Sequence, residues 1–88
     1  MKTIKDRKYS FEHTKLRILQ RYNIQITQDH YDYFCHMIKN NIGVTLISEE
    51  EQKGDIQKIY DLKHDIDPKI RVVWSEVRQC ITTALRRN

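Results

Sequence analysis

The stretch YDYFCHMIKNNIGVTLIS, residues 31–48, contains the change of hydrophobic period that decides the fold class. In its first half, apolar residues recur at helical spacing: Tyr31, Phe34, Cys35 and Ile38. In its second half, they recur at every other position, as in a strand: Ile42, Val44 and Leu46. Asn40, Asn41 and Gly43, which are typical of helix ends, lie between the two patterns. The stretch therefore predicts a helix over 28–40 and a strand that begins at residue 43.

Two helices are expected before that strand. Thr27 has the chemistry of an N-cap for the helix at 28–40, and the carboxylate of Asp29 suits its first turn. A helix over 10–22 is predicted upstream, with Ser10 as its N-cap. Its core-facing stripe would consist of residues at helical offsets: Phe11, Ile18, Leu19 and Tyr22. Residues 1–8 would then form a basic N-terminal arm.

Strands are expected after residue 43. Alternating patterns predict strands at 43–48 and 56–64, with Gly54 in the loop between them. The pair Asp67-Pro68 indicates a turn before the next strand. The last two strands would each place every second residue on one face: Ile70, Val72 and Trp74, then Ile81, Thr83 and Leu85. No segment after Gly43 could serve as a helical crossover, so the strands should be antiparallel.

These elements define the expected fold class as α+β. Two N-terminal helices would pack on a three- to four-stranded antiparallel β-meander over residues 43–86. A chain of 88 residues has room for one domain, 1–88. Its 39% hydrophobic and 32% charged residues are typical of a globular chain and exclude a disordered one. The two cysteines, Cys35 and Cys80, match no zinc or C-x-x-C spacing and should be buried free thiols.

The sequence indicates a cytoplasmic protein without a membrane partner. No stretch approaches the roughly 20 apolar residues that a spanning helix needs. The first eight residues, MKTIKDRK, lack the apolar segment of a secretory signal.

Charge is segregated along the chain although the net charge is only +4. Residues 1–22 contain seven Lys/Arg and two acids, residues 23–68 contain four and nine, and residues 69–88 contain five and one. The three parts therefore carry +5, −5 and +4. Basic ends of this kind favour contact with a polyanion, RNA first and DNA second. Two solvated basic faces would explain the same pattern.

The pattern His13-x-x-x-Arg17-x-x-x-Arg21 places an imidazole and two guanidiniums on one side of the first helix. Arginine offers planar forked donors to phosphate, and histidine can titrate near neutrality. The stripe is a candidate phosphate site, and a solvated helix face is the alternative.

Together with the order of the elements, that stripe resembles the small RelE-type and colicin-type ribonucleases of toxin and phage contexts. At the front of the chain the matching residues are His13, Arg17, Arg21 and Tyr22. At the back they are Arg71, Val72, Val73, Ile81, Thr83 and Leu85. The order of elements covers most of the chain, whereas the sharp motifs cover these few positions.

The resemblance implies RNA cleavage without a metal or other cofactor, in which a ribose 2′-hydroxyl attacks the neighbouring phosphorus. Such chemistry needs a base, cations against the charge on the phosphorane, and an acid. His13 would be the general base or acid, Arg17 the electrostatic stabiliser with Arg21 beside it, and Thr83 a hydroxyl that holds the phosphate. His64 and Tyr60 are the candidates for a second titratable group.

Two other functions fit the same sequence. In a module that binds RNA or DNA without cleaving it, basic residues would neutralise phosphates together with Arg17. These residues are Lys2, Lys5, Arg7, Lys8, Arg21, Arg71, Arg86 and Arg87. In a homo-oligomeric or partner-binding protein, such as a small phage-type inhibitor, the acidic middle of one molecule would meet the basic ends of another.

No metal site is expected. The acids at 49–51, 55, 61, 65 and 67 do not follow the closely spaced ligand pattern of a calcium loop, and acids are ordinary at turns. Most aromatic residues are expected in the core, whereas Tyr9 and Tyr33 are freer to stack on unpaired bases.

Overall fold

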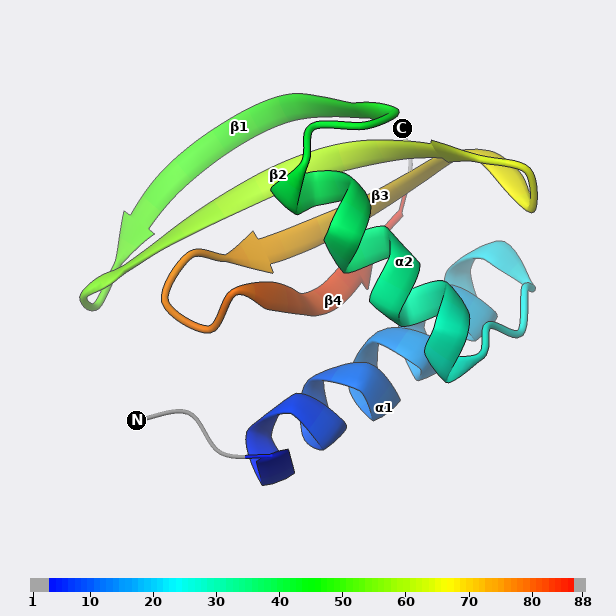
Figure 1. Cartoon of the computed structure of the whole chain (residues 1–88), viewed down its shortest axis with the longest axis horizontal. Coiled ribbons are helices and arrows are strands. Elements are labelled where there is room, and N and C mark those ends of the chain that lie inside the picture. The colour runs from blue at the N-terminus through cyan, green and yellow to red at the C-terminus, as the bar shows by residue number, and fades with distance from the viewer. Residues whose placement is uncertain (1–3, 87–88) are drawn as a thin grey trace.

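A computed structural model describes residues 4–86, with side chains from residue 8 onward, and it has an α+β fold. The helices are α1 (Ile4–Tyr22) and α2 (Gln28–Lys39). The strands are β1 (Val44–Gln52), β2 (Asp55–His64), β3 (Asp67–Ser75) and β4 (Cys80–Leu85). The strands pair antiparallel in chain order, β1-β2-β3-β4 (Figure 1). The predicted fold class is confirmed, with four strands in the meander.

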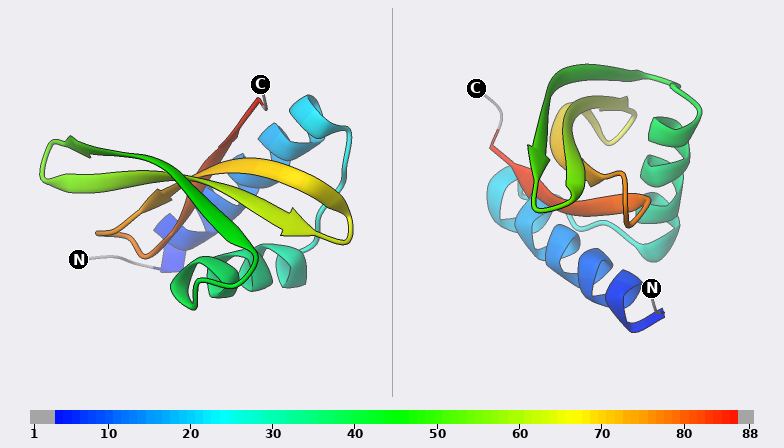
Figure 2. Two further views of the ribbon diagram at one scale, coloured as in Figure 1. Left: turned by 90° about the horizontal axis from the view of Figure 1, so that it is seen from above. Right: turned by 90° about the vertical axis from the view of Figure 1, so that its left-hand side faces the viewer.

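The hydrophobic core lies between the helices and one face of the sheet. Side chains from β2, β3 and β4 that are buried on this face belong to Leu62, Ile70, Val72, Trp74, Ile81 and Ala84. α1 packs mainly against β4, whereas the β1–β2 hairpin curves away from α1 (Figures 1 and 2). Every β1 residue after Val44 is exposed. Neither described helix combines the length and the hydropathy that crossing a bilayer would require.

α1 begins six residues earlier than the sequence predicted. Ile4 is its first residue, so positions 4–8 of the predicted basic arm are helical, and residues 1–3 lie outside the described part. Residues 4–9 contain no glycine or proline, and their lysines and arginine are good helix formers. Ser10 is therefore inside the helix, where its side chain is buried, and its assignment as the N-cap was wrong.

The buried face of α1 also differs from the predicted stripe. Phe11 and Ile18 are buried as expected, but Leu19 is 43% exposed. The buried stripe instead contains Ser10 and Thr14, whose hydroxyl oxygens are fully buried without a hydrogen-bond partner. Small polar residues let the helix approach β4 closely, and hydropathy alone did not reveal them as core residues.

α2 ends one residue before the predicted boundary, and its N-cap is confirmed. Thr27 Oγ1 accepts a hydrogen bond from His30 N at 3.2 Å. Thr27 N donates in return to His30 Nδ1 at 3.0 Å, so His30 takes the place of the usual Glu or Gln of a capping box. The buried residues of α2 include the predicted four, joined by Met37.

β1 is longer than predicted because the acidic run 49–51 continues the strand. Glu49 lies opposite Lys58, and Gln52 lies opposite Asp55. The two residues between these strands, Lys53 and Gly54, have φ angles of 45° and 80°. Positive φ at both positions is the geometry of a type I′ hairpin turn, which the right-handed twist of the strands favours.

The turn between β2 and β3 lies two residues before the predicted one. His64 pairs with Asp67, so residues 65–66 form the turn and Pro68 lies in β3. Asp67 Oδ1 accepts a hydrogen bond from Lys69 N at 2.8 Å. Proline is tolerated at the beginning of a strand because the missing donor can lie outside the ladder there.

β4 contains a bulge that changes the predicted faces. Val73 pairs with Thr83 but Trp74 pairs with Ile81, so Thr82 is an extra residue on β4. Ile81 and Ala84 are consequently buried, and Thr83 no longer shares a face with Ile81. The predicted common face of Ile81, Thr83 and Leu85 was therefore wrong.

Cys35 and Cys80 are buried free thiols, as predicted. Between α2 and β4, the Tyr31 hydroxyl donates a hydrogen bond to the Ile81 carbonyl at 2.6 Å. Burial, followed by the proximity of Cys35 and Cys80, raises the pKa of the Tyr31 hydroxyl well above its usual value. Tyr31 is therefore a neutral donor that ties α2 to β4.

Candidate nucleic-acid interface

The predicted stripe of His13, Arg17 and Arg21 lies along one flank of α1, beside its buried face. All three residues are half-buried. Arg17 Nη1 donates to the Gln20 side-chain oxygen at 3.0 Å. Arg21 Nη1 donates to the backbone carbonyl of Ala84 at 2.6 Å, which brings the end of the stripe to β4. Neither guanidinium is neutralised by these neutral acceptors, so both keep their charge for a ligand.

An aromatic platform continues the stripe toward the N-terminus. The Tyr9 ring is 67% exposed and stacks on the His13 ring, with centroids 6.0 Å apart and planes 17° apart. Within the described side chains, the ring nitrogens of His13 have no hydrogen-bond partner. The exposed Tyr9 ring, stacked on the half-buried His13 and on the same helix as two guanidiniums, offers both base stacking and phosphate contact.

The end of α1 is fastened to the sheet by Tyr22. Its hydroxyl donates to the Leu85 carbonyl at 2.6 Å and accepts the backbone N–H of Arg71 at 2.9 Å. This single hydroxyl therefore joins α1 to both β3 and β4. Arg86 follows Leu85 directly and is exposed, so it adds another cation close to the carbonyl that Arg21 binds.

Arg71 differs from the arginines of α1 because a carboxylate binds it. Its Nε and Nη2 donate to the two oxygens of Asp61 at 2.8 and 3.1 Å, in a bidentate pair across β2 and β3. Lys69 Nζ lies 3.9 Å from the same carboxylate. The hydrogen bonds from Arg71 to Asp61, more than their Coulombic attraction, raise the pKa of the guanidinium. Its predicted role as a phosphate ligand would require this pair to open.

Thr83 lies on the sheet face opposite the one that carries Ile81 and Ala84. Ala84 pairs with Val72, and both are fully buried on the face that the helices cover. Successive residues of a strand point to opposite faces, so Thr83, which pairs with Val73, belongs to the other face. Among side chains 8–86, no hydrogen bond or ion pair links Thr83 to either residue of α1. The three-residue phosphate site stays a prediction.

The structure describes some of the remaining predicted site residues and not others. Lys8 is exposed on α1. Lys5 and Arg7 have helical backbone without described side chains, and Lys2 and Arg87 lie outside the described residues. His64, a candidate second titratable group, accepts the backbone N–H of Ile66 at its Nδ1 and packs edge-on to Phe34. It therefore lies at the end of β2 against a cluster of rings from α2.

Ion pairs with carboxylates distinguish three cations of the sheet from the cations of α1. Among the side chains from residue 8 to 86, carboxylates lie within 4.0 Å of three cations, Lys58, Lys69 and Arg71, all on β2 or β3. The other cations among these side chains have no such partner: Lys8, Lys15, Arg17 and Arg21 on α1, Arg86 after β4, and Lys39, Lys53, Lys63 and Arg78 elsewhere. Lys15 instead lies 5.7 Å from the centroid of the Phe11 ring. We call the flank formed by His13, Arg17, Arg21 and Arg86 the cationic ridge.

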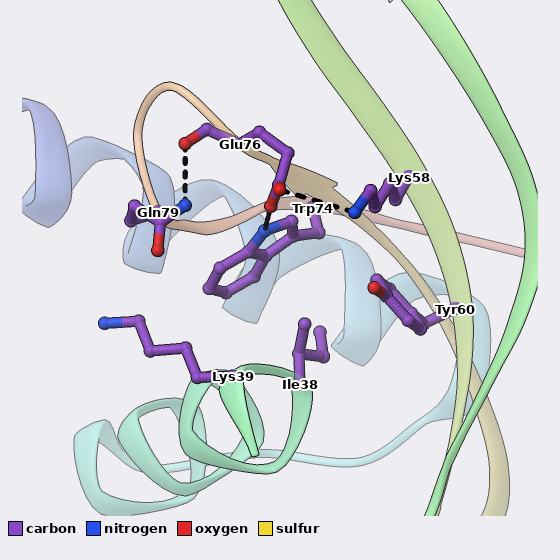
Figure 3. A pocket seen from close by; sticks show the side chains of 7 residues that line it. All are labelled: Ile38, Lys39, Lys58, Tyr60, Trp74, Glu76 and Gln79. Atoms are coloured by element: carbon purple, nitrogen blue, oxygen red, sulfur yellow. Dashed lines mark hydrogen bonds and ion pairs between the residues drawn. The ribbon is translucent and has the colours of Figure 1, made fainter. Parts of the chain in front are cut away.

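Sequence reasoning missed a pocket between α2 and the sheet. Trp74, Tyr60 and Lys39 line it, although they are far apart in the sequence (Figure 3). No local pattern could have indicated it, because the register of β2 and β3 and the position of α2 create it. In the described part of the chain, no three His, Cys, Asp or Glu side chains are grouped closely enough to hold a metal ion.

Comparisons with known proteins identified no relative of this chain. No protein-family model, curated protein or solved structure matches the chain. The resemblance to RelE-type and colicin-type ribonucleases is therefore neither supported nor opposed by these comparisons, and function must be inferred from the residues themselves.

Proposed function

We propose that this protein binds single-stranded nucleic acid, RNA in the first place, along the cationic ridge. The observation that carries the proposal is the lack of carboxylate partners on that ridge within the described part of the chain. Lys58, Lys69 and Arg71 are paired across the sheet, whereas Arg17 and Arg21 meet only neutral acceptors. A polyanion would meet these guanidiniums without first breaking an internal ion pair.

The preference for a single strand comes from Tyr9 and His13. Stacking contributes about 1–3 kcal/mol per base and requires a base that is not already paired within a duplex. Tyr9 presents an exposed ring beside the cations, and the His13 ring supports it from behind. The ridge therefore combines a stacking surface at Tyr9 with two guanidiniums about two and three helical turns away.

The test is the salt dependence of binding. Neutralised phosphates release counterions, with a slope near −0.7 per contact for a single strand. Binding of a labelled single-stranded RNA should weaken steeply with salt, and the Arg17→Gln/Arg21→Gln variant should flatten the slope by about 1.4. The matched control is Lys53→Gln/Lys63→Gln, which removes two exposed charges, one in the β1–β2 turn and one on β2. A flat salt response of the native protein would overturn the proposal.

Cleavage is the second candidate, and one observation favours it. The His13 ring nitrogens have no hydrogen-bond partner among described side chains, so the ring could exchange a proton with an RNA bound to Arg17. Incubation of total RNA in EDTA with the native protein and with His13→Ala tests this function. Equal lack of cleavage by both proteins would reject the enzyme and leave the binding proposal intact.

A further inference from the structure

Strand β1 forms one edge of the sheet and is exposed along nearly its whole length. β2 is its neighbour in the strand order, and every residue of β1 after Val44 is exposed (Figures 1 and 2). Three successive glutamates, Glu49, Glu50 and Glu51, lie on this strand. Charged side chains keep an exposed edge from pairing with a further strand. The edge is therefore protected against another acidic strand and open to a partner with positive charge.

The negative charge of β1 is only partly neutralised within the molecule. Glu49 Oε1 lies 4.0 Å from Lys58 Nζ, which lies closer, at 3.3 Å, to Glu76 Oε1. Among side chains 8–86, no ion pair involves Glu50 or Glu51. The β1–β2 hairpin curves away from α1 (Figure 2), and no ion pair joins β1 to α1 in that part of the chain. The acidic strand and the cationic ridge of one molecule therefore do not neutralise each other.

The two faces of β1 separate its glutamates. All three pair with β2 in an unbroken register. Successive residues of a strand point to opposite faces, so Glu49 and Glu51 share one face and Glu50 lies on the other. Ile56, which pairs with Glu51, belongs to the face of Glu49 and is exposed. This face of the hairpin therefore presents two carboxylates beside an apolar side chain.

The spacing of these carboxylates matches that of the guanidiniums on the cationic ridge. Two residues along a strand span about 6.6 Å. The four residues from Arg17 to Arg21 span about 6 Å along a helix. Glu49 and Glu51 are therefore spaced to meet both guanidiniums at once. Leu16, which precedes Arg17, is exposed on α1 and offers an apolar surface beside the guanidiniums.

We infer that β1 of one molecule binds the cationic ridge of a second copy of this chain. Glu49 and Glu51 pair with Arg17 and Arg21, which meet neutral acceptors within one molecule. The partner is a second copy because each of the two surfaces carries the charge that the other lacks. A bound nucleic acid would occupy the same guanidiniums, so self-association would compete with it. This competition rests on the proposed function, whereas the association itself does not.

Light scattering over a range of protein and salt concentrations tests the association. At low salt the mass should rise above that of one chain as the protein concentration increases. Salt at about 1 M, which screens charges beyond about 3 Å, should return the mass to that of one chain. A protein that stays monomeric at low salt would overturn the inference, and so would an association that high salt leaves intact.

Two variants with the same loss of charge test the face of β1. Glu49→Gln/Glu51→Gln removes both carboxylates of one face and should remain monomeric where the native protein associates. Glu50→Gln/Asp65→Asn removes one exposed carboxylate from the other face and one from the β2–β3 turn, so it should associate like the native protein. Circular dichroism checks that both variants are folded. Equal association of the two variants would contradict the assigned face.

Mixing two variants tests the pairing of the surfaces. Arg17→Gln/Arg21→Gln retains the acidic strand, and Glu49→Gln/Glu51→Gln retains the cationic ridge. Each variant should be monomeric alone, whereas the mixture contains one matching pair of surfaces and should associate, more weakly than the native protein. A mixture in which both variants stay monomeric would contradict the pairing of β1 with the ridge.

Failure of the association and failure of the proposed function are distinguishable. A labelled single-stranded RNA should separate the two copies, and Glu49→Gln/Glu51→Gln should bind this RNA more tightly than Glu50→Gln/Asp65→Asn does. A monomer that binds RNA with a steep salt dependence would reject this inference alone. A salt-sensitive association without RNA binding would support this inference and reject the proposed function.

Discussion

The cations of α1 and the cations of the sheet have the same chemistry but different surroundings. On β2 and β3, Lys58 and Arg71 lie opposite or beside carboxylates that the strand register provides, Glu76 and Asp61. On α1, Arg17 and Arg21 lie against an amide side chain and a backbone carbonyl. Lys58, Lys69 and Arg71 of the sheet are thus paired within the molecule, whereas Lys63 of β2 and the arginines of α1 lie without a carboxylate partner in the described part of the chain. Net charge alone would not separate these two roles.

The attachment of α1 to the sheet gives the largest expected effect on stability. Tyr22→Phe removes one hydroxyl that bonds both Leu85 O and Arg71 N, and it leaves a carbonyl and an N–H to find new partners. Loss of these bonds should cost about 2 kcal/mol, which lowers the melting temperature by about 10 °C. Thermal unfolding followed by circular dichroism measures it.

The control for that variant is Tyr33→Phe. Tyr33 is 46% exposed, and no hydrogen bond of its hydroxyl is found in the described part of the chain. Its substitution should leave the melting temperature within about 1 °C of the native value. Equal effects of the two substitutions would show that Tyr22 does not join α1 to β3 and β4.

A substitution on the buried face of α1 should increase the stability of the protein, in contrast to Tyr22→Phe. Thr14 is fully buried, and its hydroxyl oxygen lacks a partner among the described residues. Thr14→Val keeps the shape and removes the unsatisfied group, so stability should rise by about 1 kcal/mol. Chemical denaturation is the measurement. A decrease would indicate that the hydroxyl is satisfied by a water molecule.

Removing a paired arginine and an unpaired arginine should have different effects on stability. Arg71→Gln breaks the bidentate contact and leaves Asp61, which is 9% exposed, without its guanidinium partner. Its melting temperature should fall, by less than that of Tyr22→Phe. Arg17→Gln should leave the melting temperature unchanged, because Gln20 can bond water instead. Equal shifts in the two variants would remove the distinction between α1 and the sheet.

The smallest expected effect is a loss of stability at low pH, caused by protonation of the Asp55 carboxylate. Burial alone would raise the pKa of its carboxyl, but hydrogen bonds from Ser75 Oγ and Val77 N, with lesser help from Ile56 N and Arg78, lower it. A lowered pKa in the folded state means that the carboxylate stabilises the fold at pH values above its unfolded pKa of about 3.9.

That stability is lost as the pH falls through the folded pKa. Asp55→Asn should therefore be less stable than the native protein at neutral pH, and the difference should shrink below about pH 4. Denaturant unfolding between neutral pH and pH 3 measures the difference. A gap that stays constant across this range would show that ionisation of Asp55 does not contribute.

The sequence predicted the fold more completely than the site. Periodicity was sufficient for two helices and a meander, because the change at residues 40–43 is unambiguous. The start of α1 was misplaced because Ser10 resembles a cap, and burial of a serine depends on the approach of β4. Similarly, Thr83 was given the wrong face because the bulge at Thr82 leaves no signal in hydropathy.

The sequence alone could not predict which cations would pair with carboxylates in the folded protein. Asp61 and Arg71 are ten residues apart, and only the register of β2 and β3 places them opposite each other. The contact between Arg21 and Ala84 spans 63 residues and depends on how α1 packs. Sequence spacing did identify the stripe His13, Arg17 and Arg21, since a helix fixes that relation locally.

The most direct test of the unpaired cations is the salt dependence of single-stranded RNA binding in two double variants. Arg17→Gln/Arg21→Gln should flatten the dependence of log affinity on log salt by about 1.4, and Lys53→Gln/Lys63→Gln should leave it unchanged. Identical slopes in the two variants would contradict a role for α1 as the nucleic-acid interface.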